Sequence, residues 1–461
     1  MKPNLLSEFE DTIVALATPH GIGAIGVIRL SGKNAIEIAN LIFKGKDLTK
    51  QNSHTIHFGK IVDQDTVIDE VLVSIFIEPK SFTKENVIEI SSHGSPYIMQ
   101  RIVKLLLSKG TRLAKAGEFT KRAFLNGQFD LTQAEAVADL INSSSEATHM
   151  AAMNQMRGGF SKKIKALRRE LVNFASLIEL ELDFAEEDVE FANRTQLIGL
   201  IHTLQIEIAN LIESFSIGNV IKNGVPTVIA GKPNSGKSTL LNTLLEEEKA
   251  IVSDIPGTTR DFIEDEIHIE GISFRFTDTA GIRVAKDELE AIGIERTISK
   301  MKAASIILFL VDLVIESEKE INEEIHKLEE LGIPFLLVGN KTDKLAQSKL
   351  KQLETSFPEM IFISASAEIN IEKLKTALIR LVHFDNFKTG DTIVTNIRHI
   401  ESLTNTQTAL EDVMKGIDTN VTGDFLAMDI RQALHHLGEI TGEITTEDLL
   451  GNIFSKFCIG K

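Results

Sequence analysis

The pattern of apolar and polar positions changes three times along the chain, and each change marks a candidate domain boundary. Over residues 1–125, short runs rich in Val and Ile alternate with helical stretches such as 95–110. Short β-branched runs indicate strands, whereas apolar residues at three-to-four spacing indicate amphipathic helices. We predict a mixed α/β domain here, with strand-like runs at 11–18, 23–30, 70–77 and 86–91.

The pattern over residues 126–221 is helical. Apolar residues recur every three or four positions through 132–156 and 162–184, and no β-rich run interrupts them. The end of the chain, 386–461, has the same character. We therefore predict one helical domain built from two separate segments, with another domain inserted between them.

The inserted segment, residues 222–385, alternates strand-like and helical patterns. This alternation predicts a parallel sheet covered by helices on both faces. The fold class is thus α/β plus α, and the inserted domain is a doubly wound, mostly parallel sheet. Its strand-like runs are VPTVIA at 225–230, ISFRFTD at 272–278, SIILFLVD at 305–312, PFLLVGN at 334–340 and MIFISA at 360–365.

A phosphate-binding loop follows the first of these strands. The sequence from Gly231 to Ser238 reads G-x-x-x-x-G-K-S and precedes a helical pattern, which is the context that a P-loop requires. Glycines let the backbone turn its N–H groups toward phosphates, Lys237 can reach the β and γ phosphates, and the Ser238 hydroxyl can bind Mg²⁺. We interpret this segment as a nucleotide-binding loop.

The later strand ends indicate which nucleotide is bound. Asp278 precedes Gly281 at one strand tip, which suits Mg²⁺ through water and sensing of the γ-phosphate. Asp343, in Asn340-Lys341-Thr342-Asp343, can accept two hydrogen bonds from guanine, and adenine offers no such donor pair. Ser364, Ala365 and Ser366 can present a backbone N–H to the guanine O6. Together these motifs predict a GTPase.

Composition narrows the partners and the compartment. The 49 basic and 66 acidic residues give a net charge of −17, so a nucleic acid must meet a local basic patch. A single cysteine, Cys458, makes neither an intrachain disulfide nor a cysteine-based zinc site. The start lacks a signal-peptide pattern, and no apolar run reaches membrane-spanning length. We expect a cytoplasmic protein without a membrane partner.

Several weaker patterns have ordinary explanations. Gly21 to Gly26 reads G-x-G-x-x-G, but a strand-like run follows it, so a dinucleotide site is rejected. The basic run 162–169 can meet nucleic-acid phosphates, although a solvated helix face is favoured, as it is for the acidic run 186–190. The pairs His54 with His57 and His435 with His436 lack zinc-like spacing. The C-terminal tail is a poor match to a prenylation signal.

The ordered GTPase motifs resemble those of the translation-factor-related branch of GTPases, and the whole chain resembles the MnmE (TrmE) family of tRNA-modification GTPases. The resemblance spans DTIVALATPHGIGAIGVIRLSG at the start, GEFTKRAFLNGQFDLTQAEAVADLI in the middle and EITTEDLLGNIFSKFCIGK at the end. It implies a site for GTP, Mg²⁺ and K⁺. The implied GTP-binding residues are Asn234, Ser235, Gly236, Lys237, Ser238, Thr239, Ser253, Asp254, Ile255, Pro256, Gly257, Thr258, Thr259, Asp278, Thr279, Ala280, Gly281, Asn340, Lys341, Asp343, Ser364, Ala365 and Ser366.

The resemblance also implies how hydrolysis is catalysed. Thr259 would complete a Mg²⁺ site with Ser238, and the implied K⁺ ligands are Asn234, Ser253, Ile255 and Thr258. A monovalent cation there can stabilise transition-state charge, as an arginine finger does elsewhere. Ile282 stands where Ras-like enzymes have a glutamine, which agrees with a different mechanism. The implied catalytic residues are Lys237, Glu290 and, in the tail, Cys458; read without the resemblance, acids near 290 are more often solvated.

In the same family the N-terminal domain binds 5-formyl- or 5,10-methylene-tetrahydrofolate and holds a homodimer together. The implied folate-binding positions are Arg29, Glu89, Gln128 and Lys461. An arginine suits folate carboxylates, and a glutamate suits the pterin edge. Position 128 is Gln where we expect a basic residue in the family, which weakens any ionic contact there.

The resemblance implies a GTP hydrolase that acts on tRNA. With the FAD-containing partner MnmG, as a heterotetramer, it would add a carboxymethylaminomethyl-type group to carbon 5 of the wobble uridine. Two other interpretations remain open from the residues. One is a ribosome-assembly or RNA-chaperone-type GTPase of the Era type. The other treats the N-terminal domain as an independent one-carbon transferase with a regulatory GTPase.

Overall fold

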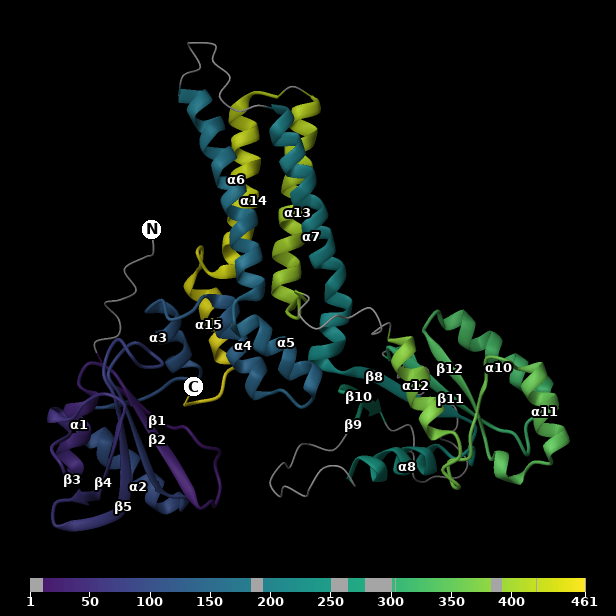
Figure 1. Ribbon diagram of the computed structural model, residues 1–461, viewed down its shortest axis with the longest axis horizontal. Coiled ribbons are helices and arrows are strands. Elements are labelled where there is room, and N and C mark those ends of the chain that lie inside the picture. Colours follow the sequence, from purple (N-terminus) through teal and green to yellow (C-terminus); the bar gives the residue numbers. More distant parts are fainter. Residues whose placement is uncertain are drawn as a thin grey trace, which may run out of the picture. The chain divides into compact units, whose positions relative to one another are not determined.

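The computed structural model describes residues 11–183, 194–249, 264–277, 301–302, 304–382, 392–419 and 421–460. The described chain forms two compact units, each of which draws on separate stretches of sequence (Figure 1). The first unit comprises the described parts of Met1–Ile141, Gln155–Ile208 and Glu401–Lys461, and the second those of Asn142–Asn154 and Ala209–Ile400. Domain boundaries at 125, 221 and 385 stay predictions.

The first unit begins with a seven-stranded sheet in the order β3-β4-β5-β6-β2-β1-β7. All neighbouring pairs are antiparallel except β1 with β7. Helices α1 (Ala35–Ile42) and α2 (Pro96–Ser108) pack on one face and bury a core with Ile28, Ile88 and Ile102. The strands are β1 (Ile13–Leu16), β2 (Ile25–Ser31), β3 (Phe43–Lys44), β4 (Thr55–Asp63), β5 (Thr66–Phe76), β6 (Val87–His93) and β7 (Arg112–Leu113).

The opposite face of this sheet is covered near β1 by α3 (Glu118–Leu125). Phe119 packs there with Ile13 and Ala15, whose side chains alternate with those of the α1 and α2 core because successive strand residues face opposite ways. A second small core joins α3 to the end of the chain. It contains Phe124, Leu131, Ala134, Leu450, Phe454 and Phe457.

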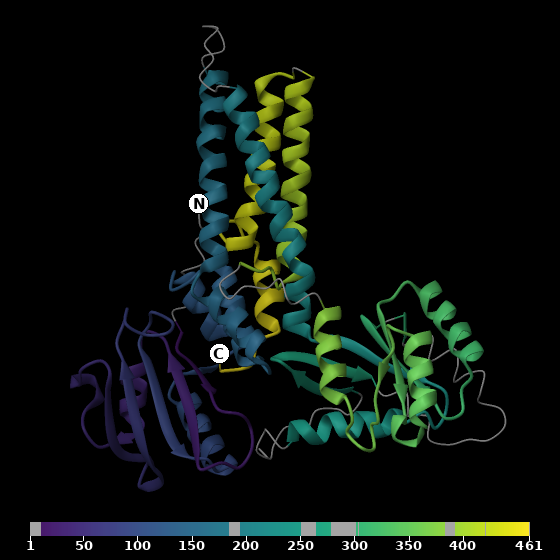
Figure 2. The ribbon, with the colours of Figure 1, turned by 45° about the vertical axis from the view of Figure 1, so that its right-hand side comes forward.

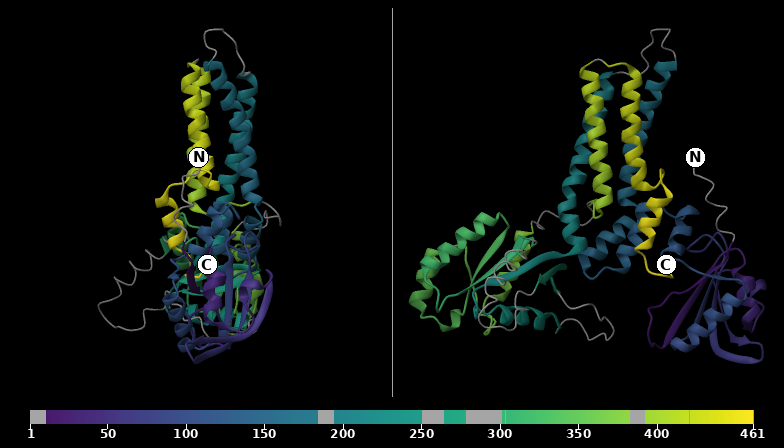
Figure 3. Two further views of the ribbon diagram at one scale, coloured as in Figure 1. Left: turned by 90° about the vertical axis from the view of Figure 1, so that its left-hand side faces the viewer. Right: turned by 180° about the vertical axis from the view of Figure 1, so that it is seen from behind.

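A tall helical bundle completes the first unit, and Figures 2 and 3 show its helices running side by side. Along α6, the buried residues Ile164, Leu167, Leu171, Ala175 and Ile178 repeat at three-to-four spacing and make a stripe that packs against α14. The long helices of the bundle are α6 (Gly159–Asp183), α7 (Arg194–Asn223), α13 (Ile397–Asp418) and α14 (Gly423–Thr441), and α7 and α13 extend into the second unit. The shorter helices α4 (Leu131–Ile141) and α15 (Glu447–Ser455) also belong to the first unit, whereas most of α5 (Glu146–Met156) belongs to the second.

The predicted helical stretch 132–156 is interrupted in the structure. α4 ends at Ile141 and α5 begins at Glu146. The Ser145 hydroxyl accepts a hydrogen bond from the backbone N–H of Thr148 at 3.2 Å, which caps the start of α5. Periodicity alone missed this break because the polar run 142–145 is short.

The second unit contains a six-stranded sheet in the order β13-β12-β11-β8-β10-β9. Its strands are parallel except β9, which pairs antiparallel with β10. They are β8 (Val225–Gly231), β9 (Glu264–Ile269), β10 (Ile272–Thr277), β11 (Ile306–Asp312), β12 (Phe335–Asn340) and β13 (Ile361–Phe362).

Helices cover both faces of this sheet, which confirms the doubly wound prediction. One core contains Leu240 of α8 (Lys237–Lys249) and Leu374 of α12 (Ile371–Leu381). The other contains Leu328 of α10 (Glu318–Leu331) and Leu353 of α11 (Gln347–Ser356). Because β11 is buried on both faces, all seven of its residues are buried, which explains its continuous apolar run.

Candidate functional site

The P-loop connects β8 to α8 as predicted. Gly231 has φ +139°, and a Cβ there would lie 2.2 Å from the Leu310 carbonyl oxygen of β11. Gly236 has φ +102°, and its Cβ would lie 2.2 Å from the Asn340 amide nitrogen. Both positions therefore require glycine for backbone geometry and for space.

Lys237 starts α8 and folds its side chain back along the loop. Its ammonium donates to the carbonyls of Gly231 at 2.8 Å and Lys232 at 2.9 Å. Ser238 and Thr239, in the first turn of α8, are exposed, and the helix N-terminus favours an anion at this place. The hydroxyl of Ser238 is a suitable oxygen donor for Mg²⁺.

Asn340, the last residue of β12, joins the P-loop to the predicted guanine-binding segments. Its side-chain amide donates to the Ser235 carbonyl at 2.8 Å. Its side-chain oxygen accepts from the backbone N–H groups of Lys341 at 2.8 Å and Ala365 at 3.0 Å. Asn340 is 3% exposed, so these hydrogen bonds are shielded from water. They hold together the loops that contain Ser235, Lys341 and Ala365.

The structure brings Asp343 and Ser364 together at the strand ends. Asp343 lies in the short 3₁₀ turn η4 (Thr342–Lys344), and its carboxylate accepts a hydrogen bond of 2.6 Å from the buried Ser364 hydroxyl. The same hydroxyl accepts from the Ala367 N–H at 3.2 Å. The carboxylate stays exposed, so its second oxygen is available for a ligand, while Ser366 is exposed beside it.

Three acidic residues between the end of β11 and the first turn of α10 contribute groups that the sequence analysis did not assign. Asp312 binds the ammonium of Lys341, and Glu316 lies 3.3 Å from the ammonium of Lys232 in the P-loop. Glu320 also binds Lys232, at 3.0 Å. The signal was present in the sequence, since Asp312 interrupts an otherwise apolar strand at its carboxyl end.

Lys232 and Glu320 each stabilise the ionised form of the other. The hydrogen bond to Glu320, with the charge of Glu316, outweighs burial and raises the pKa of Lys232. Hydrogen bonds from the backbone and hydroxyl of Ser317, together with Lys232, lower the pKa of Glu320 to about 2. Lys232 and Glu320 therefore stay charged through the neutral range, and their ion pair links the P-loop to the start of α10.

Part of the predicted site lies outside the described residues. The residues concerned are Ser253, Asp254, Ile255, Pro256, Gly257, Thr258, Thr259, Asp278, Thr279, Ala280, Gly281 and Glu290, with Lys461 of the tail. Their assignments to GTP, Mg²⁺, K⁺, catalysis and folate stay predictions. The acidic run 186–190 also lies outside the described residues.

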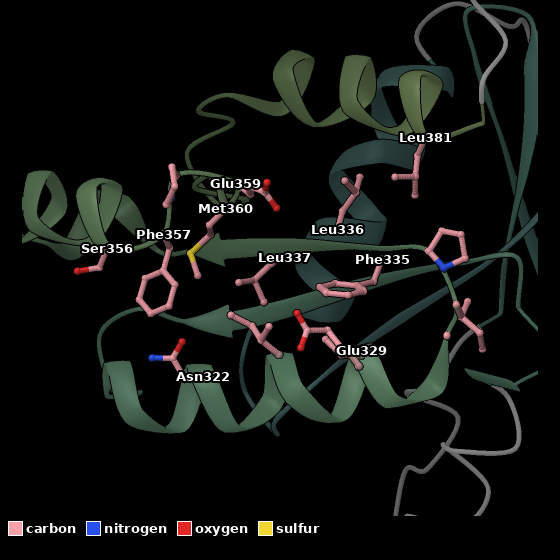
Figure 4. A pocket seen from close by; sticks show the side chains of 16 residues that line it. Asn322, Glu329, Phe335, Leu336, Leu337, Ser356, Phe357, Glu359, Met360 and Leu381 are labelled. Atoms are coloured by element: carbon pink, nitrogen blue, oxygen red, sulfur yellow. The ribbon is translucent and has the colours of Figure 1, made fainter.

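A groove on the second unit is separate from the nucleotide loops. It is lined by apolar side chains such as Phe335, Leu337, Phe357 and Met360, with Glu329 and Glu359 beside them (Figure 4). Its lining follows β12 from Phe335, the first residue of the strand, to Met360, whose sulfur lies beside Gly339, and it contains no residue of the P-loop. In doubly wound sheets ligands bind at the carboxyl ends, which is where the predicted residues lie.

In the first unit, the C-terminal tail contacts Arg29, a predicted folate position that is paired with another, Glu89. Arg29 of β2 and Glu89 of β6 are cross-strand neighbours, and their side chains form an ion pair at 2.8 Å. Arg29 also contacts the Gly460 carbonyl at 3.4 Å, and its guanidinium lies 5.9 Å from the Phe82 ring. The tail is thus within reach of a ligand bound at Arg29.

The tail is held there by close backbone packing. Gly460 has φ +99°, and a Cβ would lie 2.3 Å from the carbonyl oxygen of Leu16. The carbonyl of Cys458 accepts from the Gly117 N–H at 3.4 Å, and the Cys458 side chain is exposed. Gln128 is exposed after α3. The structure therefore brings Arg29, Glu89 and the described part of the tail together, and no hydrogen bond or ion pair joins Gln128 to these described residues.

The weaker candidates have structural partners. In the basic run, Lys163 binds Glu207 at 2.6 Å, Lys165 binds Asp130 at 2.7 Å and Arg168 binds Glu443 at 2.6 Å, which favours a helix face over a phosphate site. Within the described residues, no group of three or more His, Cys, Asp or Glu side chains is arranged to hold a metal ion. Nor does any helix in the described ranges have the length and apolarity needed to cross a membrane.

The doubly wound sheet, the P-loop and the aligned strand-end residues define a P-loop GTP hydrolase. Comparison with known proteins gives the particular family. A family model described as the MnmE helical domain matches residues 131–458, and one described as the GTP-binding protein TrmE N-terminus matches residues 12–128. The chain belongs to the MnmE (TrmE) family of tRNA-modification GTPases.

Full-length relatives agree with this assignment. The chain is 58% identical to the tRNA modification GTPase MnmE of Cytophaga hutchinsonii over 461 residues, which cover 100% of both chains. It is 55% identical to that of Flavobacterium psychrophilum, covering 98% of this chain and 100% of the relative. Among solved structures, Aquifex aeolicus Era bound to GDP.AlF4- is 26% identical with a TM-score of 0.27, covering 41% of this chain and 66% of that chain.

Proposed function

We propose that this GTPase uses Mg²⁺ and K⁺ to hydrolyse GTP. The main support is the geometry of the described P-loop, in which Asn234 has a left-handed φ of +64° and its carbonyl is held by Lys341 at 2.8 Å. A fixed Asn234 suits a side-chain ligand to a cation beside the phosphates. Such a cation would supply positive charge where negative charge grows in the transition state.

In this proposal each residue has one task. Lys237 and the P-loop N–H groups bind the β and γ phosphates, and Ser238 and Thr259 hold Mg²⁺. Asn234, Ser253, Ile255 and Thr258 hold K⁺, and Glu290 orients the attacking water. The N–H of the Ser364–Ser366 loop meets the guanine O6, and the Asp343 carboxylate accepts from guanine N1 and N2. The carboxylate is oriented for this by its 2.6 Å hydrogen bond from Ser364.

The decisive experiment compares GTP hydrolysis in KCl and NaCl at equal ionic strength. We expect K⁺-specific stimulation in the intact chain and its loss in Asn234→Ala. Asn322→Ala, an exposed asparagine on α10, is the matched control and keeps the stimulation. A transition-state analogue should raise the apparent mass only in K⁺, through association of GTPase domains in a homodimer. Equal slow rates in both salts contradict the proposal.

We further propose that the Arg29–Glu89 region binds a tetrahydrofolate, 5-formyl or 5,10-methylene, with Gln128 and Lys461 beside it. The contact between Arg29 and the tail supports this, because it gathers an arginine, a carboxylate and the chain end in one place. Cys458 lies in the same tail as a candidate catalytic group. The bound folate would supply the one-carbon unit.

Folate binding is tested by calorimetry with 5-formyltetrahydrofolate. Arg29→Met is expected to weaken binding by roughly 10-fold or more, because it leaves Glu89 without its partner and removes a cation from the ligand. Arg101→Met, on α2 across the sheet, is the control and binds as the intact chain does. Unchanged binding in Arg29→Met would remove this residue from the site.

The complete reaction is proposed to require the FAD-containing partner MnmG in a heterotetramer. Together they would add a carboxymethylaminomethyl-type group to carbon 5 of the wobble uridine. Modified nucleoside should form only when the chain, MnmG, tRNA, GTP and the folate are all present. Folate turnover by the chain alone would instead favour an independent one-carbon transferase. Membership of a tRNA-modification family gives no support to the alternative role in ribosome assembly.

A further inference from the structure

A buried carboxylate behind the nucleotide loops has no role in the proposed function. Asp312 is the last residue of β11 and is 4% exposed. One carboxylate oxygen binds the ammonium of Lys341 at 2.5 Å, and the other accepts the Val314 N–H at 3.0 Å. A buried carboxylate requires a charged or hydrogen-bonding partner, so Lys341 is held in place by a strong local constraint.

Lys341 uses the same ammonium to reach the P-loop. It donates to the Asn234 carbonyl at 2.8 Å, so one side chain connects β11, β12 and the phosphate loop. A lysine ammonium is a compact charge with three donors, which allows it to bind both acceptors at once. The Lys341 ammonium therefore links the Asp312 carboxylate to the Asn234 carbonyl by direct hydrogen bonds.

Two residues of this connection, Asn234 and Lys341, have left-handed backbone conformations. Asn234 has φ +64° and Lys341 has φ +69°. A left-handed conformation is uncommon for a residue other than glycine and persists only where surrounding contacts impose it. Lys341 also precedes η4, the turn that carries Asp343, so its conformation sets where that turn begins. Through Lys341, Asp312 is thus connected both to the P-loop at Asn234 and to the turn that carries Asp343.

We propose that Asp312 is a positioning residue for nucleotide binding. Through Lys341 it fixes the P-loop turn at Asn234 relative to the turn that carries Asp343. The proposal deepens the proposed function and rests on its assignment of these two loops to the phosphates and the guanine base. Asp312 itself does not touch the nucleotide.

The test replaces Asp312 by Asn, which keeps the shape and an oxygen for the Val314 N–H but removes the charge facing Lys341. In the full chain, a fluorescent GDP analogue should bind roughly 10- to 100-fold more weakly, mainly through faster dissociation. Glu323→Gln, an exposed carboxylate farther along α10, is the control and leaves GDP binding unchanged. Unchanged binding in Asp312→Asn overturns the proposal.

A double-mutant cycle separates positioning from a general loss of stability. In a Lys341→Met chain, the further change Asp312→Asn should alter GDP affinity less than about two-fold, because the group on which Asp312 acts has gone. The same loss in both backgrounds contradicts the proposal. If Asp312→Asn alone does not fold, Lys341→Met and the double variant still give this comparison, and a further loss of affinity in the double variant overturns it.

A separate variant tests the site assignment on which the proposal depends. Asp343→Asn replaces an acceptor of guanine protons by a donor that matches the 2-oxo group of xanthine. It should prefer xanthosine diphosphate over GDP. If it does and Asp312→Asn has no effect, only the positioning role fails. If the base preference does not change, the assignment of the guanine site fails.

Discussion

The proposed GTP site of the second unit and the charged interior of the first unit satisfy their buried polar groups in different ways. At the GTP site, Asn340 bonds the backbone of neighbouring loops at 2.8–3.0 Å. In the first unit, the fully buried Arg122 binds the carboxylates of Asp11 and Glu85, which come from distant segments, and that of Glu118, one turn earlier in α3. A site made of backbone geometry leaves a local motif in the sequence, whereas a charge network assembled from afar leaves none.

The largest expected effect concerns the proposed GTP site, whose residues form a local sequence motif. Gly236→Ala places a Cβ 2.2 Å from the Asn340 amide nitrogen on a backbone at φ +102°. We expect GTP and GDP binding to be lost, as measured by equilibrium binding of labelled nucleotide. Gly199→Ala is the control, because a Cβ there meets nothing within 4 Å and α7 should gain roughly 0.5–1 kcal/mol. Retained nucleotide affinity in Gly236→Ala would show that the loop can rearrange.

On the other side of the comparison, Arg122→Met removes the cation that binds Glu85 and leaves the buried Glu118 with Arg112 alone. We expect a loss of about 3–5 kcal/mol in local stability around α3, with little direct effect on nucleotide binding. Hydrogen exchange of the 118–125 backbone measures this without assuming that the whole chain unfolds in one step. Lys104→Met, an exposed lysine on α2, should be close to neutral. Equal protection in both variants would mean that the network contributes little.

The pH dependence of the first unit sharpens the comparison further. Burial alone would raise the pKa of Glu118, but hydrogen bonds from Arg112, the Lys115 N–H and Arg122 outweigh it, and the pKa lies below 4.5. Such a group contributes stability above its unfolded pKa, and the contribution is lost as pH falls through the lowered folded value.

Thermal unfolding of the first unit should therefore shift to lower temperature as the pH falls below about 4.5. In Glu118→Gln this dependence should be smaller, and the variant and the intact chain should converge in acid. Glu447→Gln, at the start of α15, removes another carboxylate and serves as the control. Parallel curves for Glu118→Gln and the intact chain would exclude Glu118 as the source.

The smallest expected effect concerns the basic face of α6. Lys163→Ala removes an ion pair with Glu207 in which both side chains are about one-third exposed, so the change in stability should stay within about 1 kcal/mol. Because the lysine already has an acidic partner, tRNA affinity should change little in a filter-binding assay. Glu207→Ala is the paired control. A marked loss of tRNA binding in Lys163→Ala alone would reassign this face as a phosphate contact.

The sequence by itself determined the class of the second unit and predicted the positions of its nucleotide loops. Gly231, Gly236 and Asn340 are needed where one strand end meets another, and this local need appears as a motif. The same reasoning assigned Lys341 to the base side, but it did not reveal that Asp312 holds it, because a carboxylate at a strand end has many possible partners.

Only the tertiary structure decided which distant groups meet. Arg29 and Gly460 are separated by 431 residues, yet they are in contact, because the core around Phe454 returns the chain end to the N-terminal sheet. The break between α4 and α5 was likewise fixed by the Ser145 cap and not by periodicity. Hydrophobic spacing reports which face of an element is buried, whereas the partner of that face depends on how the elements pack.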